Sequence, residues 1–278
     1  MNMAMNPTQT RASAGTLAKP APGSIIFDKV SVVFETAKLT AVSEFSLNIA
    51  PGEFVSIVGP SGCGKTTLLN FAAGLLPSGA GRGTMLVNGK PPVTGSRGVA
   101  YMLARDALAP WRTALGNAEL GAEVRGVSAE KRRARALDLL EKVGLKGFED
   151  AYPKALSQGM RQRVALARTL VTGPDVILLD EPFAALDFQT KVVLESDMAK
   201  LVRSDGRSVL LITHDVEEAV SLSDRVIVLT HRPSRIKAIH DIRLQGDRSD
   251  MMAMRDAPGF AALVREIWSE LDVRMAET

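Results

Sequence analysis

Hydrophobic and polar residues along the chain form two kinds of pattern, one typical of strands and one typical of helices. Short apolar runs separated by polar turns predict an antiparallel β layer near the start, at residues 25–27, 30–34 and 45–49. Four later apolar runs predict buried strands, at residues 54–58, 176–179, 209–212 and 226–229. Helical patterns lie between these runs, as in a parallel sheet covered on both faces, so the expected fold class is α/β.

A helix-rich insert is expected over about residues 104–170, inside the α/β unit. One helix should begin after Ser128 as its N-cap and end at Gly144. It would carry its apolar face on Ala136, Leu139, Leu140 and Val143. The expected organisation is a disordered extension at residues 1–23, one domain at 24–245 that includes the insert, and a helical extension at 246–278.

Composition limits the class of protein. The chain is 46% hydrophobic and 23% charged, and it holds no apolar stretch of the roughly 20 residues that cross a bilayer. A net charge of +3 gives no reason to expect nucleic acid as a partner. The single cysteine, Cys63, excludes an intramolecular disulfide and favours a reducing compartment such as the cytosol.

A glycine-rich segment follows the apolar run at residues 54–58. It fits the phosphate-loop pattern Gly-x-x-x-x-Gly-Lys-Thr with Gly59, Pro60, Ser61, Gly62, Cys63, Gly64, Lys65 and Thr66. Backbone N–H groups of such a loop and of the helix after it bind phosphate oxygens, so ATP is the expected ligand. Lys65 would bridge the β- and γ-phosphates, Thr66 would bind Mg²⁺, and Thr67 would reach the α-phosphate. Because Cys63 lies in this loop, a maleimide should inhibit the protein and ATP should protect it.

Two adjacent carboxylates end the apolar run at residues 176–179. Asp180 would be delivered beside Mg²⁺ and would hold it through water. Glu181 would point toward the γ-phosphate and act as the base that orients or deprotonates the attacking water.

Residues 156–168, Leu-Ser-Gln-Gly-Met-Arg-Gln-Arg-Val-Ala-Leu-Ala-Arg, resemble the signature segment of ATP-binding-cassette ATPases. Other motifs at the family's positions extend the resemblance over about residues 25–230: Asp180-Glu181-Pro182, Ala185-Leu186-Asp187 and Thr213-His214-Asp215. The resemblance implies a parallel-sheet core, an N-terminal antiparallel β layer and a helical subdomain that carries the signature segment.

The resemblance also assigns roles to single residues. Ser157 and Gly159 would donate hydrogen bonds to the γ-phosphate held by the opposite subunit of a dimer, and Gln158 lies between them. Asp187 would belong to the dimer-contact loop at the nucleotide site. His214 would contact the γ-phosphate and Glu181, and Phe34 would stack on adenine.

Within the family, residues 105–113, which include Pro110-Trp111-Arg112, look like a stretch found in importers of nitrate, sulfonate, taurine and bicarbonate. This implies an ATPase on the cytoplasmic face of the inner membrane of a bacterium, peripheral to it. Its partners would be a transmembrane permease, an extracytoplasmic solute-binding protein acting through that permease, and a second copy of the ATPase. Trp111 and Trp268 are both expected to be packed, Trp268 as an anchor of the final helix.

Two residues depart from the family pattern. Ala104 stands where the family has a glutamine that senses Mg²⁺, and neither alanine nor the neighbouring Arg105 can supply that carbonyl. Hydrolysis should survive through Asp180, Glu181 and His214, with altered rate or coupling. Gln158 replaces a glycine, which costs about 1 kcal/mol or more if the position needs a positive φ and little otherwise.

Two other classes of protein use similar motifs. A soluble cassette ATPase acting on DNA, ribosomes or iron–sulfur assembly would usually carry a long coiled-coil insert, a second cassette or added metal ligands, and this sequence has none of these. A metabolic kinase with a phosphate loop would leave the signature segment and His214 unexplained.

Overall fold

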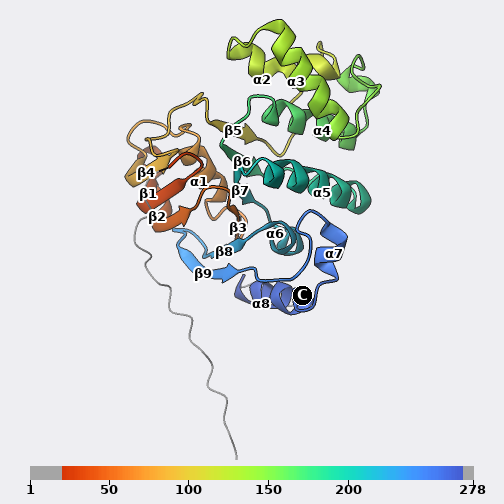
Figure 1. The fold of residues 1–278 in the computed structure, drawn as a ribbon. Helices are drawn as coiled ribbons and strands as arrows, with labels where there is room; N and C mark the ends of the chain where they lie inside the picture. Colours follow the sequence, from red (N-terminus) through yellow and green to blue (C-terminus); the bar gives the residue numbers. More distant parts are fainter. Residues whose placement is uncertain (1–20, 272–278) are drawn as a thin grey trace, which may run out of the picture.

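The computed structural model describes residues 21–271. The strands are β1 (Ile25–Phe34), β2 (Leu39–Ile49), β3 (Phe54–Val58), β4 (Gly81–Val87), β5 (Val99–Met102), β6 (Val176–Asp180), β7 (Ser208–Ile212), β8 (Arg225–Leu229) and β9 (Ile236–Asp241). The α-helices are α1 (Lys65–Ala72), α2 (Ala114–Val124), α3 (Ala129–Lys142), α4 (Gln158–Leu170), α5 (Phe188–Ser204), α6 (Val216–Leu222), α7 (Met251–Arg255) and α8 (Phe260–Glu270). Figure 1 shows their arrangement.

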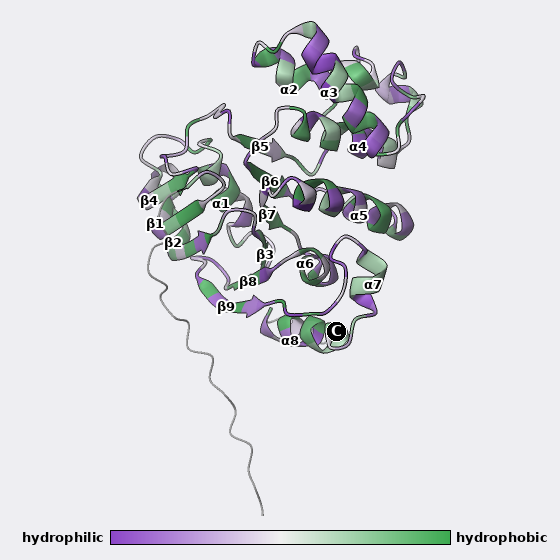
Figure 2. Cartoon of the chain, viewed as in Figure 1, coloured by the Kyte–Doolittle hydropathy of each residue, from purple (hydrophilic) through white to green (hydrophobic). Residues whose placement is uncertain are grey.

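The central sheet has the strand order β5-β6-β7-β3-β8-β9, parallel except for β9 at its edge. Its middle strands are buried on both faces, which explains why each is a continuous apolar run (Figure 2). Alternate residues face opposite sides. Ile177 and Leu179 pack with α4 and α5, whereas Val176 and Leu178 pack with α1.

The antiparallel layer predicted for the start of the chain is present as a separate sheet, with the order β2-β1-β4. It packs onto the α1 side of the central sheet and shares a core with it. Phe27 and Phe45 meet edge to face within that core, with ring centroids 5.1 Å apart. The α/β fold class predicted from the sequence is confirmed; β4, β5 and β9 were not predicted.

The helical insert consists of α2, α3 and α4, which Figure 1 shows grouped beyond β5. Ser128 occupies the N-cap position of α3, although its side chain makes no capping hydrogen bond. Of the predicted apolar face, Ala136, Leu140 and Val143 are fully buried and Leu139 is partly buried. The solvent side of α3 is strongly hydrophilic, as Figure 2 shows.

The C-terminal part packs β9, α7 and α8 against α5, α6 and β8. Ile267, Val264 and Phe260 bury the inner face of α8. Trp268 is 46% exposed, so the expectation that it anchors this helix is wrong, and the neighbouring Ile267 has that place. Among residues 21–271, no helix is both long and apolar enough to span a membrane.

The predicted disordered extension lies outside the described residues up to residue 20, as do residues 272–278 of the predicted helical extension. Ala21, Pro22 and Gly23 are described and form a turn ahead of β1, in which the Ser24 hydroxyl donates to the Ala21 carbonyl oxygen at 2.7 Å.

Candidate nucleotide site

The phosphate loop, residues 59–66, connects the carboxyl end of β3 to the start of α1. Gly62 and Gly64 adopt φ values of +71° and +112°, which residues with a Cβ rarely adopt. A Cβ at Gly64 would also lie 3.1 Å from the carbonyl oxygen of Ala41. The glycine spacing therefore lets the loop curl around the N-terminus of α1, where free N–H groups favour an anion.

Lys65, the first residue of α1, is buried in the loop with only 7% of its surface exposed. Its ammonium donates to the carbonyl oxygens of Gly59 at 2.8 Å and Pro60 at 3.1 Å. Since an ammonium has three N–H donors, one remains for a phosphate oxygen at the mouth of the loop.

Thr66 and Asp180 meet between α1 and the end of β6. The Thr66 hydroxyl donates to Oδ1 of Asp180 at 3.1 Å. The Tyr101 hydroxyl, on β5, lies 3.3 Å from Oδ2 of Asp180 and 3.1 Å from Oδ1 of Asn70. Burial is the main cause that raises the pKa of Asp180, and hydrogen bonds from Thr66 and Tyr101 oppose it. The two predicted metal ligands are thus adjacent, and their oxygen atoms suit a hard cation such as Mg²⁺.

Glu181 and His214 face each other at the ends of β6 and β7. Glu181 has a φ of +48°, which turns the chain sharply after β6, and its N–H donates to the Ile212 carbonyl oxygen at 2.8 Å. Non-glycine residues in this conformation are uncommon and concentrate at functional sites. Oε2 of Glu181 lies 3.2 Å from Nδ1 of His214.

The predicted signature residues lie at the N-terminus of α4. Ser157 is the N-cap and accepts a 3.2 Å hydrogen bond from the N–H of Met160. Gln158 is the first residue of α4, and its φ is not positive. Glutamine in place of the family's glycine therefore causes no backbone strain here. Gly159 is buried, and a Cβ there would lie 2.4 Å from Cγ2 of Thr190. Asp187 caps α5 by accepting from the N–H of Thr190. Hydrogen bonds from the hydroxyl and then the N–H of Thr190 lower the pKa of the exposed Asp187 carboxyl.

The central sheet separates the two groups of predicted nucleotide contacts. The phosphate loop leads into α1, which packs on one face of the sheet, and Ser157 begins α4, which packs on the other. Figure 1 shows α1 and α4 on opposite sides of β5 and β6. One chain therefore brings Lys65, Thr66, Asp180, Glu181 and His214 to one edge of the sheet, whereas the signature residues belong to a separate surface.

The segment after β5 connects this edge to the helical insert. Ala104 and Arg105 are exposed. Asp106 accepts from Nε of Arg161 at 2.9 Å, and Arg168 donates to the carbonyl oxygen of Ala107 at 2.8 Å, so the segment is tied to α4. Trp111 is 76% exposed, so the expectation that it is packed is wrong.

Two other predicted contacts have different surroundings. Phe34 ends β1 and is partly buried against the core, so its stacking on adenine stays a prediction.

Cys63 is 1% exposed, and burial raises the pKa of its thiol although the charge of Lys65 opposes this. The side chain lies within the core, so inhibition by a maleimide and protection by ATP stay a prediction, with slow labelling expected in the native chain.

The sequence analysis missed three residues near the site: Tyr101, which contacts Asp180, Asn70, which contacts Tyr101, and Lys191, which contacts Asp215. Asn70 lies one helical turn after Thr66, a spacing that places both on one face of α1. Nothing in the sequence indicates the place of Tyr101, because the partner of β5 is set by the tertiary fold.

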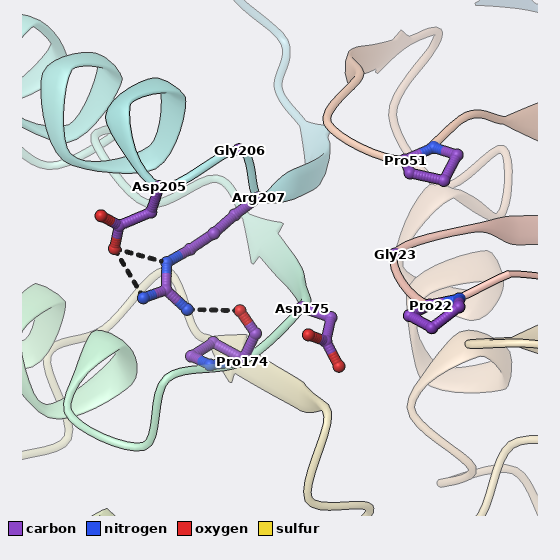
Figure 3. A pocket seen from close by; sticks show the side chains of 8 residues that line it. All are labelled: Pro22, Gly23, Pro51, Pro174, Asp175, Asp205, Gly206 and Arg207. Carbon is purple, nitrogen blue, oxygen red and sulfur yellow. Dashed lines mark hydrogen bonds and ion pairs between the residues drawn. The ribbon is translucent and has the colours of Figure 1, made fainter.

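Among residues 21–271, one cavity and one cluster of side chains around His240 lie away from this edge. A cavity of about 350 Å³, shown in Figure 3, opens at the amino ends of the strands between Pro51 and Asp175. Its Arg207 is already bound to Asp205 and to the Pro174 carbonyl oxygen.

His240 has a glutamate near each ring nitrogen. Its Nδ1 lies 3.8 Å from Glu266, and its Nε2 lies 2.9 Å from Glu270. Since the two ring nitrogens point apart, the two carboxylates approach different edges of the imidazole ring.

A phosphate loop, a carboxylate pair and a histidine at the carboxyl edge of a parallel sheet define a P-loop ATPase, and the separate signature helix makes it one of the cassette type. The profile described as ABC transporter matches residues 42–184. The chain belongs to this family and is an ABC ATPase.

Relatives and solved structures agree with this assignment. A putative ATP-binding protein of Brucella abortus biovar 1 is 46% identical over 242 residues, covering 86% of this chain and 90% of the relative. The taurine import ATP-binding protein TauB of Rhizobium johnstonii is 40% identical over 230 residues, covering 82% and 87%. The dimeric structure of MJ0796, a bacterial ABC transporter cassette, superposes with a TM-score of 0.68 at 32% identity, covering 79% of this chain and 99% of that one. A post-hydrolysis state of MJ0796 bound to ADP and Pi matches equally well, with a TM-score of 0.68.

Proposed function

We propose that this chain is the ATP-hydrolysing subunit of a bacterial importer that takes up a small anionic or organic solute such as nitrate, a sulfonate or taurine. The observation that carries the importer assignment is the 40% identity to a taurine import ATP-binding protein over 82% of the chain. The chain would lie on the cytoplasmic face of the inner membrane. A permease and an extracytoplasmic solute-binding protein would select the solute.

At the phosphate end of the site, the amides of residues 59–66 and the ammonium of Lys65 bind the phosphates of ATP. Thr67, in the first turn of α1, is placed to reach the α-phosphate. Thr66 and Asp180, whose oxygens lie 3.1 Å apart, would hold Mg²⁺, Asp180 through water. The ion would supply positive charge against the phosphate oxygens. Both groups already hydrogen-bond each other, so little rearrangement is needed to present their oxygens together.

Glu181 acts as the base, and His214 orients it. A carboxylate with one oxygen 3.2 Å from an imidazole nitrogen is held in one rotamer, and its other oxygen is left for water. The positive φ of Glu181 breaks the extended conformation directly after β6, where the side chain meets His214.

A second copy of the chain completes the site. Ser157, Gln158 and Gly159 lie at a helix N-terminus across the sheet from the phosphate loop, so they can serve only a nucleotide held by another subunit. Asp187 lies beside them at the start of α5. The matching dimeric cassette supports this arrangement.

The permease would contact the exposed surface that includes Leu103, at 48%, and Trp111, at 76%. Apolar side chains this exposed mark an interaction surface when they cluster, and the hydrogen bonds from Arg161 and Arg168 link their segment to α4. Ala104 offers no side-chain polar atom that could transmit a movement of this segment. The movement would instead reach the signature helix α4 through Asp106, which accepts from Arg161.

Two measurements test the proposal. Glu181→Gln should retain ATP binding and form a stable dimer with ATP on size exclusion, while unchanged hydrolysis would reject its role as the base. Affinity capture of the tagged chain from native membranes should recover a multi-span permease, and candidate anions should stimulate the ATPase of the captured complex. Recovery of ribosomes or DNA in place of a permease would contradict the importer assignment.

A further inference from the structure

Five ionisable side chains from three segments meet next to His214. They are Lys191 and Glu195 of α5, Asp215 and Glu218 at the start of α6, and Arg255 at the end of α7, and are called the Lys191 cluster below. The side chains of Glu195 and Glu218 are 0% and 2% exposed, and that of Lys191 is 11% exposed. Buried charges of this number are costly unless they are paired, so their arrangement needs a reason.

Lys191 is the centre of the cluster. Its ammonium lies 2.7 Å from Oδ2 of Asp215, 2.6 Å from Oε2 of Glu218 and 3.7 Å from Oε1 of Glu195. Burial lowers the pKa of Lys191, but the charge of Glu218 and hydrogen bonds to Asp215 and Glu218 outweigh this and leave it above its ordinary value. Lys191 therefore stays charged and holds carboxylates from α5 and α6 at one point.

Arg255 closes the cluster on its outer side. Its guanidinium lies 3.4 Å from Oε2 of Glu195 and stacks over the ring of Phe188, with Cζ 5.0 Å from the ring centroid. Glu195 thus lies between Lys191 and Arg255. The side chains of Arg255 and Glu195 are 10% and 0% exposed, so this pair is less sensitive to screening by salt than a surface pair.

The cluster is attached to two site segments through the backbone. Asp215 directly follows His214, and its other oxygen, Oδ1, accepts the N–H of Glu218 at 3.1 Å and so caps α6. On the other side, the N–H of Lys191 donates to the carbonyl oxygen of Asp187 at 2.9 Å. Lys191 therefore lies one helical turn after Asp187. It also forms an ion pair with Asp215, the residue after His214.

We propose that Lys191 is a positioning residue for ATP hydrolysis, which keeps His214 against Glu181 by holding Asp215 at the start of α6. Through its place in α5, it also fixes His214 relative to Asp187, where the second copy would bind. The inference rests on the proposed role of His214, and it adds a residue that touches neither the nucleotide nor Glu181.

The experiment is a double-mutant cycle on the full-length chain with Lys191→Met, His214→Ala and the combination. If Lys191 acts through His214, Lys191→Met should lower kcat at least about tenfold with KM for ATP within about twofold, and it should cost nothing further in the His214→Ala background. Lys191→Arg, which keeps the charge, should recover part of kcat. The matched control is Lys200→Met, at an exposed position of the same helix, which should leave kcat unchanged.

Each other result has a defined meaning. If His214→Ala keeps full activity, the proposed role of His214 fails. If His214→Ala is impaired but Lys191→Met is not, or if the two losses multiply, the inference about Lys191 is overturned. Should Lys191→Met fail to fold, Asp215→Asn keeps an oxygen for the α6 cap and weakens only the ion pair. It should lower kcat without a matching loss of melting temperature, and an unchanged kcat would overturn the inference.

Discussion

The hydroxyl of Tyr101 lies 3.3 Å from Oδ2 of Asp180, whose other oxygen accepts from Thr66 at 3.1 Å. Both oxygens of the carboxylate are therefore oriented by hydroxyl groups from different elements. Partners of this kind set the direction in which a ligand presents its lone pairs. Tyr101 also belongs to the strand that leads to Ala104, so it links the segment proposed to face the permease to the predicted metal ligand.

Tyr101→Phe removes this hydroxyl and keeps the ring. We expect the Mg²⁺ concentration for half-maximal ATPase activity to rise about tenfold, because Asp180 loses one of its two orienting partners. Binding of a fluorescent ATP analogue without Mg²⁺ should not change. The only other tyrosine, Tyr152, provides the control Tyr152→Phe, and an equal Mg²⁺ response in both variants would contradict the role of Tyr101.

Glu195→Gln should change how stability depends on pH. Burial, with the neighbouring charge of Glu218, raises the pKa of Glu195 to about 8, whereas an unfolded chain has a value of about 4.3. The folded state thus binds a proton that the unfolded state has released, so this group costs stability increasingly as the pH rises from about 4 to about 8.

Urea unfolding at about pH 5, 7 and 9 measures this effect. The variant should lose less stability than the parent over this range, by up to about 1.4 kcal/mol per pH unit. Glu217→Gln, on the exposed side of α6, should follow the parent curve. Parallel curves for parent and Glu195→Gln would show that Glu195 is ionised in the folded chain.

Cys63 should react slowly with maleimide in the native chain. Its thiol is 1% exposed, and burial raises its pKa, so both access and the thiolate fraction are low. We expect labelling at least about 100-fold slower than in urea, since reaction requires local opening. As the chain has one cysteine, mass spectrometry reports this site alone. Rapid native labelling would show that the phosphate loop opens readily.

Gln158→Gly should affect stability and leave hydrolysis almost unchanged. Gln158 begins α4 in a helical conformation, so glycine relieves no strain and only adds backbone freedom. The expected loss is at most about 1 kcal/mol in unfolding free energy, measured by thermal melting. A clear gain in ATPase rate would indicate that the glutamine side chain obstructs the signature surface.

Patterns with a local cause could be predicted from the sequence. The run at Phe54–Val58, followed by Gly62 and Gly64, gave the strand and phosphate loop because periodicity and positive φ act within a few residues. Asp180 and Glu181 followed from the end of an apolar strand. Family resemblance, and not periodicity, led to His214 and Ser157.

Long-range packing explains the failures. Trp111 and Trp268 were expected inside because tryptophan is large and apolar, but neighbours such as Ile267 fill the core. Apart from Lys191 and Glu195 on one helix, the ion pairs of the Lys191 cluster join residues that are 24, 27 and 60 positions apart, so no local spacing rule could have indicated it.

The opposite placement of α1 and α4 on one sheet has a kinetic consequence. If each catalytic centre takes its phosphate loop from one chain and its signature helix from another, turnover per molecule of the isolated chain must rise with protein concentration and approach zero at high dilution, while nucleotide binding persists. Mixing active chains with an excess of inactive ones should then reduce activity more steeply than simple dilution. A permease that holds two copies together would remove this dependence, so the membrane partner would supply proximity as well as a transport path.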